Sequence, residues 1–389
     1  MASRIAAPTR RAEHWASTMS GQSADDAAVR HAHADGFHRL TPPKPMTRER
    51  REALEAETLA TGATLASGAG RRELDESPDD FRTCFERDRD RILHGTTAFR
   101  RLAGKTQVFI FPEDHQRTRL THALEVAQVA TAVARAVGLN VALAEAIALG
   151  HDCGHGPGGH ASEDAFTPYL EGGYDHAVWG ADVVLRPLNL CVETLDGIRN
   201  HSWSRPTPMT PEGEVVSWAD RIAYVCHDFE DAVHTGIVTE DQLPDLVAQR
   251  CGSTRKQQLN TFVSAMVNTI CETGHIGMDE SNAEALAAFR RFNYERIYMR
   301  PASVAQSESV IRVLRALVEY FADRPNTLPL DGLEGSLPSD RPLHPAGSSE
   351  ALVDAVTYVA GMTDRFAFNA AITSLGWDRS ALPFGVGVF

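Results

Sequence analysis

The stretch EAIALGHDCGHGPGGH, residues 145–160, carries an apolar helical pattern directly into a group of histidines and glycines. Residues 141–150 are mostly apolar and predict a buried helix. His151 and Asp152 follow at once, and the glycine-rich run 154–159 then stops the helix. Because glycines let the backbone approach a ligand closely, this sequence predicts a metal or anion site at the end of the helix.

Two further candidate ligands lie in apolar segments before and after this stretch. His122 falls on one helical stripe with Val126 and Val129, so it faces inward, where an imidazole needs a partner. Asp220 lies within the apolar segment 214–234, where an unpaired carboxylate would cost several kcal/mol, on the order of the penalty for a buried ion. The predicted metal ligands are therefore His122, His151, Asp152 and Asp220.

The donor set of these four residues restricts the chemistry. Imidazole and carboxylate donors suit Mn²⁺, Fe²⁺, Mg²⁺ or Zn²⁺ and need no thiolate. A divalent metal with open positions activates water and polarises a phosphoryl oxygen, so the set points to a metal-dependent phosphohydrolase. The structural alternatives are a satisfied core histidine at 122, a helix-capping aspartate at 152 and an exposed polar stripe at 220, 224 and 228. The glycine run and the flanking valines and isoleucines argue against them.

A basic segment, residues 82–105, stands out in an otherwise acidic chain. Its alternating Arg and Asp residues at 87–91 fit either a solvated helix face with ion pairs or an anion site. Arg100, Arg101 and Lys105 have fewer acids beside them, and guanidinium groups bind phosphates in a bidentate manner. The segment therefore predicts a small polyphosphate ligand near the metal residues.

Composition excludes several classes of protein. The 389 residues carry a formal net charge of −14, which disfavours a general nucleic-acid surface. The six cysteines form no CxxC pair, which favours reduced thiols in a cytoplasmic protein. No apolar run resembles a signal peptide or a membrane span.

Periodicity predicts an all-α fold. Helical patterns cover 46–62, 118–137, 141–150, 190–200 and 214–234, with a last helix over about 350–373 capped by Ser348 or Ser349, and strand patterns are scarce. The predicted organisation is a flexible N-terminal tail (1–45), a helical core (46–323), a Pro/Gly-rich loop (324–349) and a C-terminal helix and tail (350–389).

The chain resembles a known family in several ordered blocks. It is similar to the bacterial deoxyguanosinetriphosphate triphosphohydrolase-like proteins, which are HD-domain dNTP triphosphohydrolases. The resemblance is dense over about 46–235 and looser through DAVTYVAGMTDRFAF (354–368). The blocks that carry it are RDRDRILH (87–94), AFRRLAGKTQVF (98–109), RTRLTHALEVAQVA (117–130), EAIALGHDCGHGPGGH (145–160) and ADRIAYVCHD (219–228).

The resemblance implies a helical HD-domain fold and metal-dependent hydrolysis of a dNTP, such as dGTP, to deoxynucleoside and tripolyphosphate. By motif position, His160 is the catalytic histidine and Glu163 its acidic partner, one helical turn away. A homo-oligomer is also implied. The residues implied to contact substrate are Gln107, Arg119, His155, His176, Arg221, Tyr224 and Asp228.

Two departures from the family pattern lie in the glycine-rich loop, at Cys153 and Gly158. The family commonly has Leu or Ile at the first position and a bulky apolar residue at the second. Three alternatives to dNTP hydrolysis stay open: an HD phosphohydrolase of another nucleotide, a dNTP sensor with little turnover, and, disfavoured by charge, a single-stranded nucleic-acid binder. The base, the native metal, activation by a second dNTP and the number of subunits are not fixed by the sequence.

Overall fold

The computed structural model describes residues 9–19, 21–23, 29–33, 35–36, 38–108, 116–329 and 342–383, and the chain divides into two compact units, Met1–Met46 and Thr47–Phe389. The described residues are predominantly helical, and the only strands among them have two residues each, which confirms the all-α prediction. Within these ranges no helix combines the length and apolar character needed to cross a membrane.

The first unit contains short elements that the sequence did not predict. They are helix α1 (Arg10–Ser17) and strands β1 (Gln22–Ser23) and β2 (Arg30–His31), which pair antiparallel. Thr9 begins α1 by accepting a hydrogen bond from the Ala12 N–H, and no residue of the helix is buried. That residues 1–45 form a flexible tail stays a prediction.

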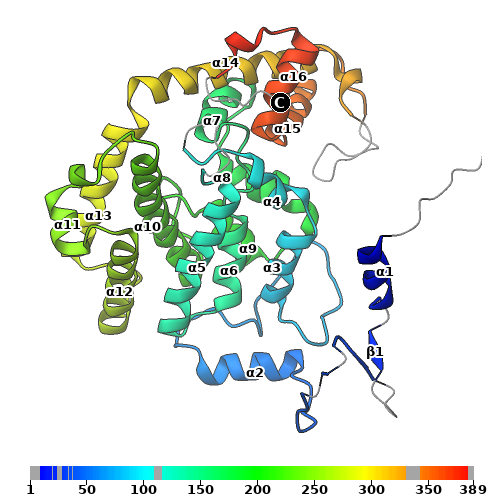
Figure 1. Ribbon diagram of the computed structural model, residues 1–389, viewed down its shortest axis with the longest axis vertical. Coiled ribbons are helices and arrows are strands. Elements are labelled where there is room, and N and C mark those ends of the chain that lie inside the picture. Colours follow the sequence, from blue (N-terminus) through cyan, green and yellow to red (C-terminus); the bar gives the residue numbers. More distant parts are fainter. Residues whose placement is uncertain are drawn as a thin grey trace, which may run out of the picture. The chain divides into compact units, whose positions relative to one another are not determined.

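The second unit is built mainly from helices, with longer non-helical segments such as residues 59–83 between them (Figure 1). Its α-helices are α2 (Arg48–Thr58), α3 (Cys84–His94), α4 (Thr97–Arg101), α5 (Arg119–Val137), α6 (Val141–Gly150), α7 (His160–Phe166), α8 (His176–Trp179), α9 (Val192–Arg199), α10 (Pro211–His234), α11 (Asp245–Cys251), α12 (Arg255–Thr273), α13 (Glu280–Asn293), α14 (Pro301–Asp323), α15 (Ser349–Ala360) and α16 (Asp364–Leu375).

Helix α6 lies at the centre of the main core and packs against α3, α5, α9 and α10 (Figure 1). Gly138 ends the preceding α5 at a φ of 76°, a left-handed conformation that glycine adopts without strain. Asn140 then caps α6 by accepting a hydrogen bond from the Leu143 N–H. These bounds confirm the helices predicted over 118–137 and 141–150. Because α6 is short and almost wholly buried, its last residues deliver His151 and Asp152 into the interior.

A second apolar cluster joins α7 to the C-terminal helices α14, α15 and α16. The single helix predicted over 350–373 is wrong, since the chain breaks between α15 and α16. Ser348 caps α15 as predicted, and Thr363 caps α16 by accepting a hydrogen bond from the Phe366 N–H. A threonine cap inside an apolar pattern starts a new helix without interrupting the periodicity, so the break was not visible in the sequence.

The break between α15 and α16 places two buried charges against the glycine-rich loop. Asp364 accepts hydrogen bonds from the Gly158 N–H (2.8 Å), the Thr106 N–H (2.8 Å) and the Thr106 hydroxyl (2.5 Å). Lys105 donates from Nζ to the carbonyls of His155 and Ala360. Because these contacts join the end of the chain to the loop after α6, we call Lys105 and Asp364 the C-terminal clamp.

Candidate metal centre and active site

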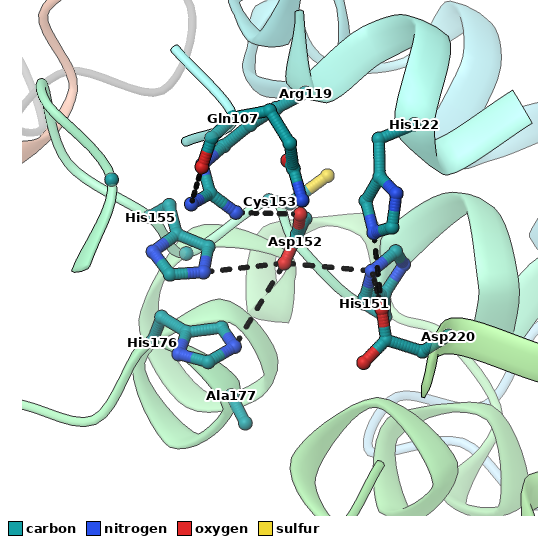
Figure 2. Close-up of polar contacts among 12 residues, drawn as sticks. Gln107, Arg119, His122, His151, Asp152, Cys153, His155, His176, Ala177 and Asp220 are labelled. Atoms are coloured by element: carbon teal, nitrogen blue, oxygen red, sulfur yellow. Dashed lines mark hydrogen bonds and ion pairs between the residues drawn. The ribbon is translucent and has the colours of Figure 1, made fainter. Parts of the chain in front are cut away.

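Three of the four predicted metal ligands converge from separate helices. Ligand atoms of His122 on α5, His151 at the end of α6 and Asp220 on α10 all lie within 4.8 Å of one another. His122 Nε2 is 3.0 Å from Asp220 Oδ1, and His151 Nε2 is 3.7 Å from the same oxygen. The fourth, Asp152, lies beside them, with Oδ1 3.5 Å from His151 Nε2 (Figure 2). The structure therefore brings the predicted set together.

The orientation of His151 fits a metal ligand. Its Nδ1 lies 2.7 Å from the Ala148 carbonyl oxygen, an acceptor, so Nδ1 carries the proton and Nε2 presents its lone pair. That Nε2 atom is buried and has no hydrogen-bond partner among the described residues. A buried polar nitrogen without a partner is costly, and a divalent cation between His122, His151, Asp152 and Asp220 would satisfy it. Together with the mixed nitrogen and oxygen donors, this fits a divalent metal.

Electrostatics at the two carboxylates also fit a cation site. Burial opposes ionisation of Asp220, but the hydrogen bond from His122 and the neighbouring imidazoles hold its pKa well below the ordinary value. Burial likewise opposes ionisation of Asp152, whose pKa is nevertheless lowered by His151 and by Arg119. Both side chains are therefore carboxylates at neutral pH, ready to bind a cation without first losing a proton.

Next to the metal residues, Asp152 organises the residues expected to contact phosphate. Its Oδ2 accepts a hydrogen bond from Arg119 at 2.7 Å, and its Oδ1 lies 3.3 Å from His155 Nε2 and 3.8 Å from His176 Nε2 (Figure 2). The His155 and His176 rings stack with centroids 3.7 Å apart. Arg119 also donates to the Gln107 carbonyl oxygen. The family resemblance implies that these residues contact substrate, and the structure brings Arg119, His155 and His176 around one carboxylate.

Glu163, the predicted acidic partner of His160, makes its shortest contact with a different histidine. Glu163 lies one helical turn after His160 on α7, but its Oε1 lies 2.5 Å from His176 Nδ1 on α8. Ligand atoms of His160 and Glu163 lie within 4.8 Å of one another, but no hydrogen bond joins the two side chains among the described residues. Helical spacing puts two side chains on one face, yet it cannot show that a third side chain from another helix reaches the carboxylate first. Glu163 therefore orients His176.

His160 is exposed to the cavity beside the metal residues and is neutral at physiological pH. Enclosure by the cavity walls lowers the pKa of His160 to about 4, and the positive charge of Arg119 acts in the same direction. A neutral imidazole that faces a cavity is suited to accept a proton there. This protonation state is what the catalytic role assigned to His160 requires.

The cavity is lined both by metal residues and by the side chains expected to hold a sugar. It has a volume of about 570 Å³, and Gln107, Arg221, Tyr224 and Asp228 line it together with Arg119. Tyr224 accepts a hydrogen bond from Arg290 Nε at 2.9 Å. Asp228 accepts one from the Tyr298 hydroxyl. Every predicted site residue except His151 and Glu163 contributes directly to the cavity wall.

The prediction that the basic segment binds a polyphosphate near the metal residues is wrong, because the segment does not line the cavity beside those residues. No residue of 82–105 is among the described residues that line the cavity. Arg87 and Arg91 pair with Glu76, Arg89 pairs with Asp90, and Lys105 is used in the C-terminal clamp. The arginines that line the cavity are Arg119, Arg221 and Arg290. Local charge density did not reveal which arginines already have acidic partners.

The sequence missed three site residues: His201, Arg290 and Tyr298. His201 follows α9 and repeats the geometry of His151, since its Nδ1 lies 2.8 Å from the carbonyl oxygen three residues before it, at Ile198. Its Nε2 is 3.3 Å from His176 Nε2, and its ring centroid is 4.9 Å from that of His151. A histidine just after a helix could have been flagged, whereas Arg290 and Tyr298 lie in no recognisable motif.

Comparison with known proteins agrees with this arrangement. An HD domain model matches residues 119–225, the segment that holds all four predicted metal ligands, and a phosphohydrolase-associated domain model matches residues 276–371. The fold and the site thus define an HD-domain, metal-dependent phosphohydrolase.

Curated relatives show to which family of HD-domain phosphohydrolases the chain belongs. A deoxyguanosinetriphosphate triphosphohydrolase-like protein of Caldanaerobacter subterraneus subsp. tengcongensis is 39% identical over 327 residues, covering 82% of this chain and 93% of that protein. A protein of the same name from Clostridium perfringens is 38% identical, covering 83% and 95%. The chain belongs to the family of deoxyguanosinetriphosphate triphosphohydrolase-like proteins. Among solved structures, a phosphohydrolase of Bacteroides thetaiotaomicron aligns with a TM-score of 0.43 at 16% identity, covering 73% of this chain and 68% of that chain.

Asp228 yields a prediction about stability and pH. Burial raises the pKa of Asp228 from 3.8 to about 7, against the hydrogen bond from Tyr298. Below about pH 4 Asp228 is protonated in both the folded and the unfolded chain, so it does not change the free energy of unfolding. Above about pH 4 the unfolded chain ionises first, so the free energy of unfolding falls as the pH rises to about 7 and then stays constant. Asp228→Asn, which mimics the protonated form, should therefore raise Tm at pH 8 by more than at pH 5.

This comparison is made by thermal unfolding of both proteins across pH 4–9 in the presence of EDTA, so that metal affinity does not contribute. A difference in Tm that is the same at every pH would contradict the assigned titration, because a packing effect does not depend on protonation.

Proposed function

We propose that the protein hydrolyses deoxynucleoside triphosphates to deoxynucleoside and tripolyphosphate. The observation that carries the proposal is one cavity of about 570 Å³ that is lined both by residues of the His-Asp metal set and by Tyr224 and Asp228. A hydroxyl-accepting carboxylate in the same cavity as a phosphate-activating centre suits a sugar that carries a 5′-polyphosphate. The names of the relatives, which are deoxyguanosinetriphosphate triphosphohydrolase-like proteins, support the same substrate class.

The predicted ligands His122, His151, Asp152 and Asp220 would hold a divalent metal, which supplies a Lewis acid for the α-phosphate and lowers the pKa of bound water. Arg119 keeps Asp152 ionised and places positive charge beside the phosphates. His155 and His176 lie against the same carboxylate and add donors there. These contacts hold the triphosphate end while Gln107, Tyr224 and Asp228 hold the deoxyribose end.

The proton transfers fall to His160. Water attacks the α-phosphorus, and the bond between that phosphorus and the 5′ oxygen breaks. His160 is neutral at the start, since its pKa is about 4, so it accepts the proton of the attacking water. The resulting imidazolium can return that proton to the departing 5′ oxygen, which leaves the imidazole neutral for the next turnover. Glu163 acts on this sequence through His176, whose orientation it sets.

The experiment is turnover of each of the four dNTPs, alone and mixed, with Mn²⁺ or Mg²⁺, with the products resolved as tripolyphosphate, pyrophosphate or phosphate. We expect deoxynucleoside and tripolyphosphate in equal amounts. Pyrophosphate or phosphate as the main product would favour the alternative of an HD phosphohydrolase that acts on another nucleotide. Nucleotide binding without any turnover would favour the alternative of a dNTP sensor. A homo-oligomer and a cytoplasmic location stay predictions.

A further inference from the structure

Two cysteines from distant segments of the chain bring their thiols together. Cys84 is the first residue of α3, and Cys191 directly precedes α9. Both sulfur atoms face Gly70, since a methyl group at Gly70 would lie 2.5 Å from Cys84 Sγ and 3.5 Å from Cys191 Sγ. A hydrogen bond with the Cys84 thiol, together with burial, raises the pKa of the Cys191 thiol. The missing side chain at Gly70 therefore leaves the space in which the two sulfur atoms approach each other.

A buried ion pair fixes the backbone at both cysteines. Arg72 Nη1 lies 2.7 Å from Asp88 Oδ1, and both side chains are almost fully buried. Arg72 donates from Nη2 to the Cys84 carbonyl oxygen at 3.1 Å, whereas Asp88 Oδ2 accepts the Cys191 N–H at 2.8 Å and the Thr194 hydroxyl at 2.7 Å. Breaking a buried, hydrogen-bonded ion pair is strongly destabilising. The two thiols are therefore held close to each other by the surrounding fold.

The two thiols differ in how easily a reagent reaches them. Cys84 is half-buried and lines a cavity of about 390 Å³, whose wall includes residues 66–72. Cys191 is fully buried and does not line that cavity. This cavity shares no lining residue with the active-site cavity. An accessible thiol beside a buried one suits a reaction in which an oxidant attacks the first sulfur and the second sulfur resolves the product.

We propose that Cys84 and Cys191 form a reversible oxidation site at which hydrogen peroxide produces a disulfide. The Cys84 sulfur attacks one peroxide oxygen, the O–O bond breaks, and the thiol proton leaves with the released hydroxide as water. The Cys191 sulfur then attacks the sulfenic acid at Cys84, an S–S bond forms, and the hydroxyl leaves with the Cys191 proton as a second water. The two thiols lose two electrons and two protons, and the peroxide is reduced to water.

The disulfide acts on stability through the segment that it encloses. Residues 84–191 contain three of the predicted metal ligands, His122, His151 and Asp152, together with His160. Closing a long loop stabilises a fold mainly by restricting the unfolded chain. Neither cysteine lines the active-site cavity, so oxidation changes resistance to unfolding and leaves the active-site wall intact. A disulfide that forms only in the presence of an oxidant also agrees with the reduced thiols that the sequence predicts.

The test is treatment of the reduced, full-length protein with hydrogen peroxide in EDTA, which prevents metal-catalysed oxidation. Mass spectrometry of a non-reduced digest then identifies crosslinked peptides, and thermal unfolding gives Tm. We expect a peptide pair joined through Cys84 and Cys191, the loss of two of the six free thiols, and a Tm higher by about 5 °C or more. Dithiothreitol should reverse all three changes.

Cys84→Ser should abolish the crosslink and the rise in Tm, because a hydroxyl cannot react with peroxide in this way. Cys271→Ser is the matched control, since Cys271 is an exposed cysteine on α12, and this variant should behave like the wild-type protein. Oxidation of Cys84 to a sulfinic acid without a crosslink would overturn the proposal. So would a crosslink between Cys226 and Cys251 in its place, or a rise in Tm that persists in Cys84→Ser. No readout requires a nucleotide, so the result is independent of the proposed function.

Discussion

Asp152→Asn should lower kcat for dNTP hydrolysis on the order of 10³-fold, the scale of losing a central electrostatic contact in an active site. One carboxylate oxygen of Asp152 lies among His151, His155 and His176, and the other accepts a hydrogen bond from Arg119. Asparagine fills the same space but removes the charge, and its amide N–H group must face either Arg119 or the metal site. Both cations then lose a counter-charge in a buried setting.

The measurements are kcat, metal content by elemental analysis, and Tm. Asp90→Asn is the control, because Asp90 also pairs with arginine side chains but does not line the active-site cavity. It should leave kcat and metal content unchanged. Activity within about tenfold of wild type in Asp152→Asn, with the metal fully retained, would show that Asp152 is not a ligand.

The second large effect concerns His160, Glu163 and His176. His160→Gln should lower kcat on the order of 10²-fold or more, since it removes the group proposed to carry the proton. Glu163→Gln should lower kcat less, because its carboxylate acts on His176 and not on the reacting atoms. Burial opposes protonation of His176, yet the hydrogen bond with Glu163 raises its pKa. The His176 limb of the pH profile should therefore shift to lower pH in Glu163→Gln.

Two double-mutant cycles distinguish the observed contact from the predicted one. Glu163→Gln combined with His176→Asn should show a coupling energy of about 1 kcal/mol or more, because the two side chains are in contact. Glu163→Gln combined with His160→Gln should show a smaller coupling energy than the first cycle, because these two side chains lie close together but form no hydrogen bond. Strong coupling only in the second cycle would restore the His160–Glu163 pair that the family resemblance implies.

What the sequence predicted well depends on local periodicity and on ordered motifs. The helices before and after Gly138 are predicted nearly to the residue, because each has a stop or a cap that acts within a few residues. The metal set also comes together as predicted, since His122 and Asp220 lie on α5 and α10 and His151 directly follows the buried helix α6. Burial of a polar residue in an apolar pattern is a signal that a single chain can carry.

What the sequence could not predict depends on contacts between distant segments. The partner of Glu163 is thirteen positions away on another helix, and Asp228 receives its hydrogen bond from Tyr298, seventy positions later. The basic segment misled because acids elsewhere, such as Glu76, had already paired with its arginines. In each case the spacing along the helix was correct, while the pairing depended on a side chain from another segment.

The C-terminal clamp has a consequence for how the protein is made. Gly158 and its partner Asp364 are separated by 206 positions, and Lys105 lies 255 positions before the carbonyl of Ala360. Chains leave the ribosome N-terminus first. The Gly158 N–H in the loop after α6 therefore lacks its acceptor, Asp364, until synthesis is almost finished. A nascent chain thus carries the metal residues long before its catalytic loop is secured. Chains that terminate before Asp364 would be released without that contact, which ties completion of the active site to completion of translation.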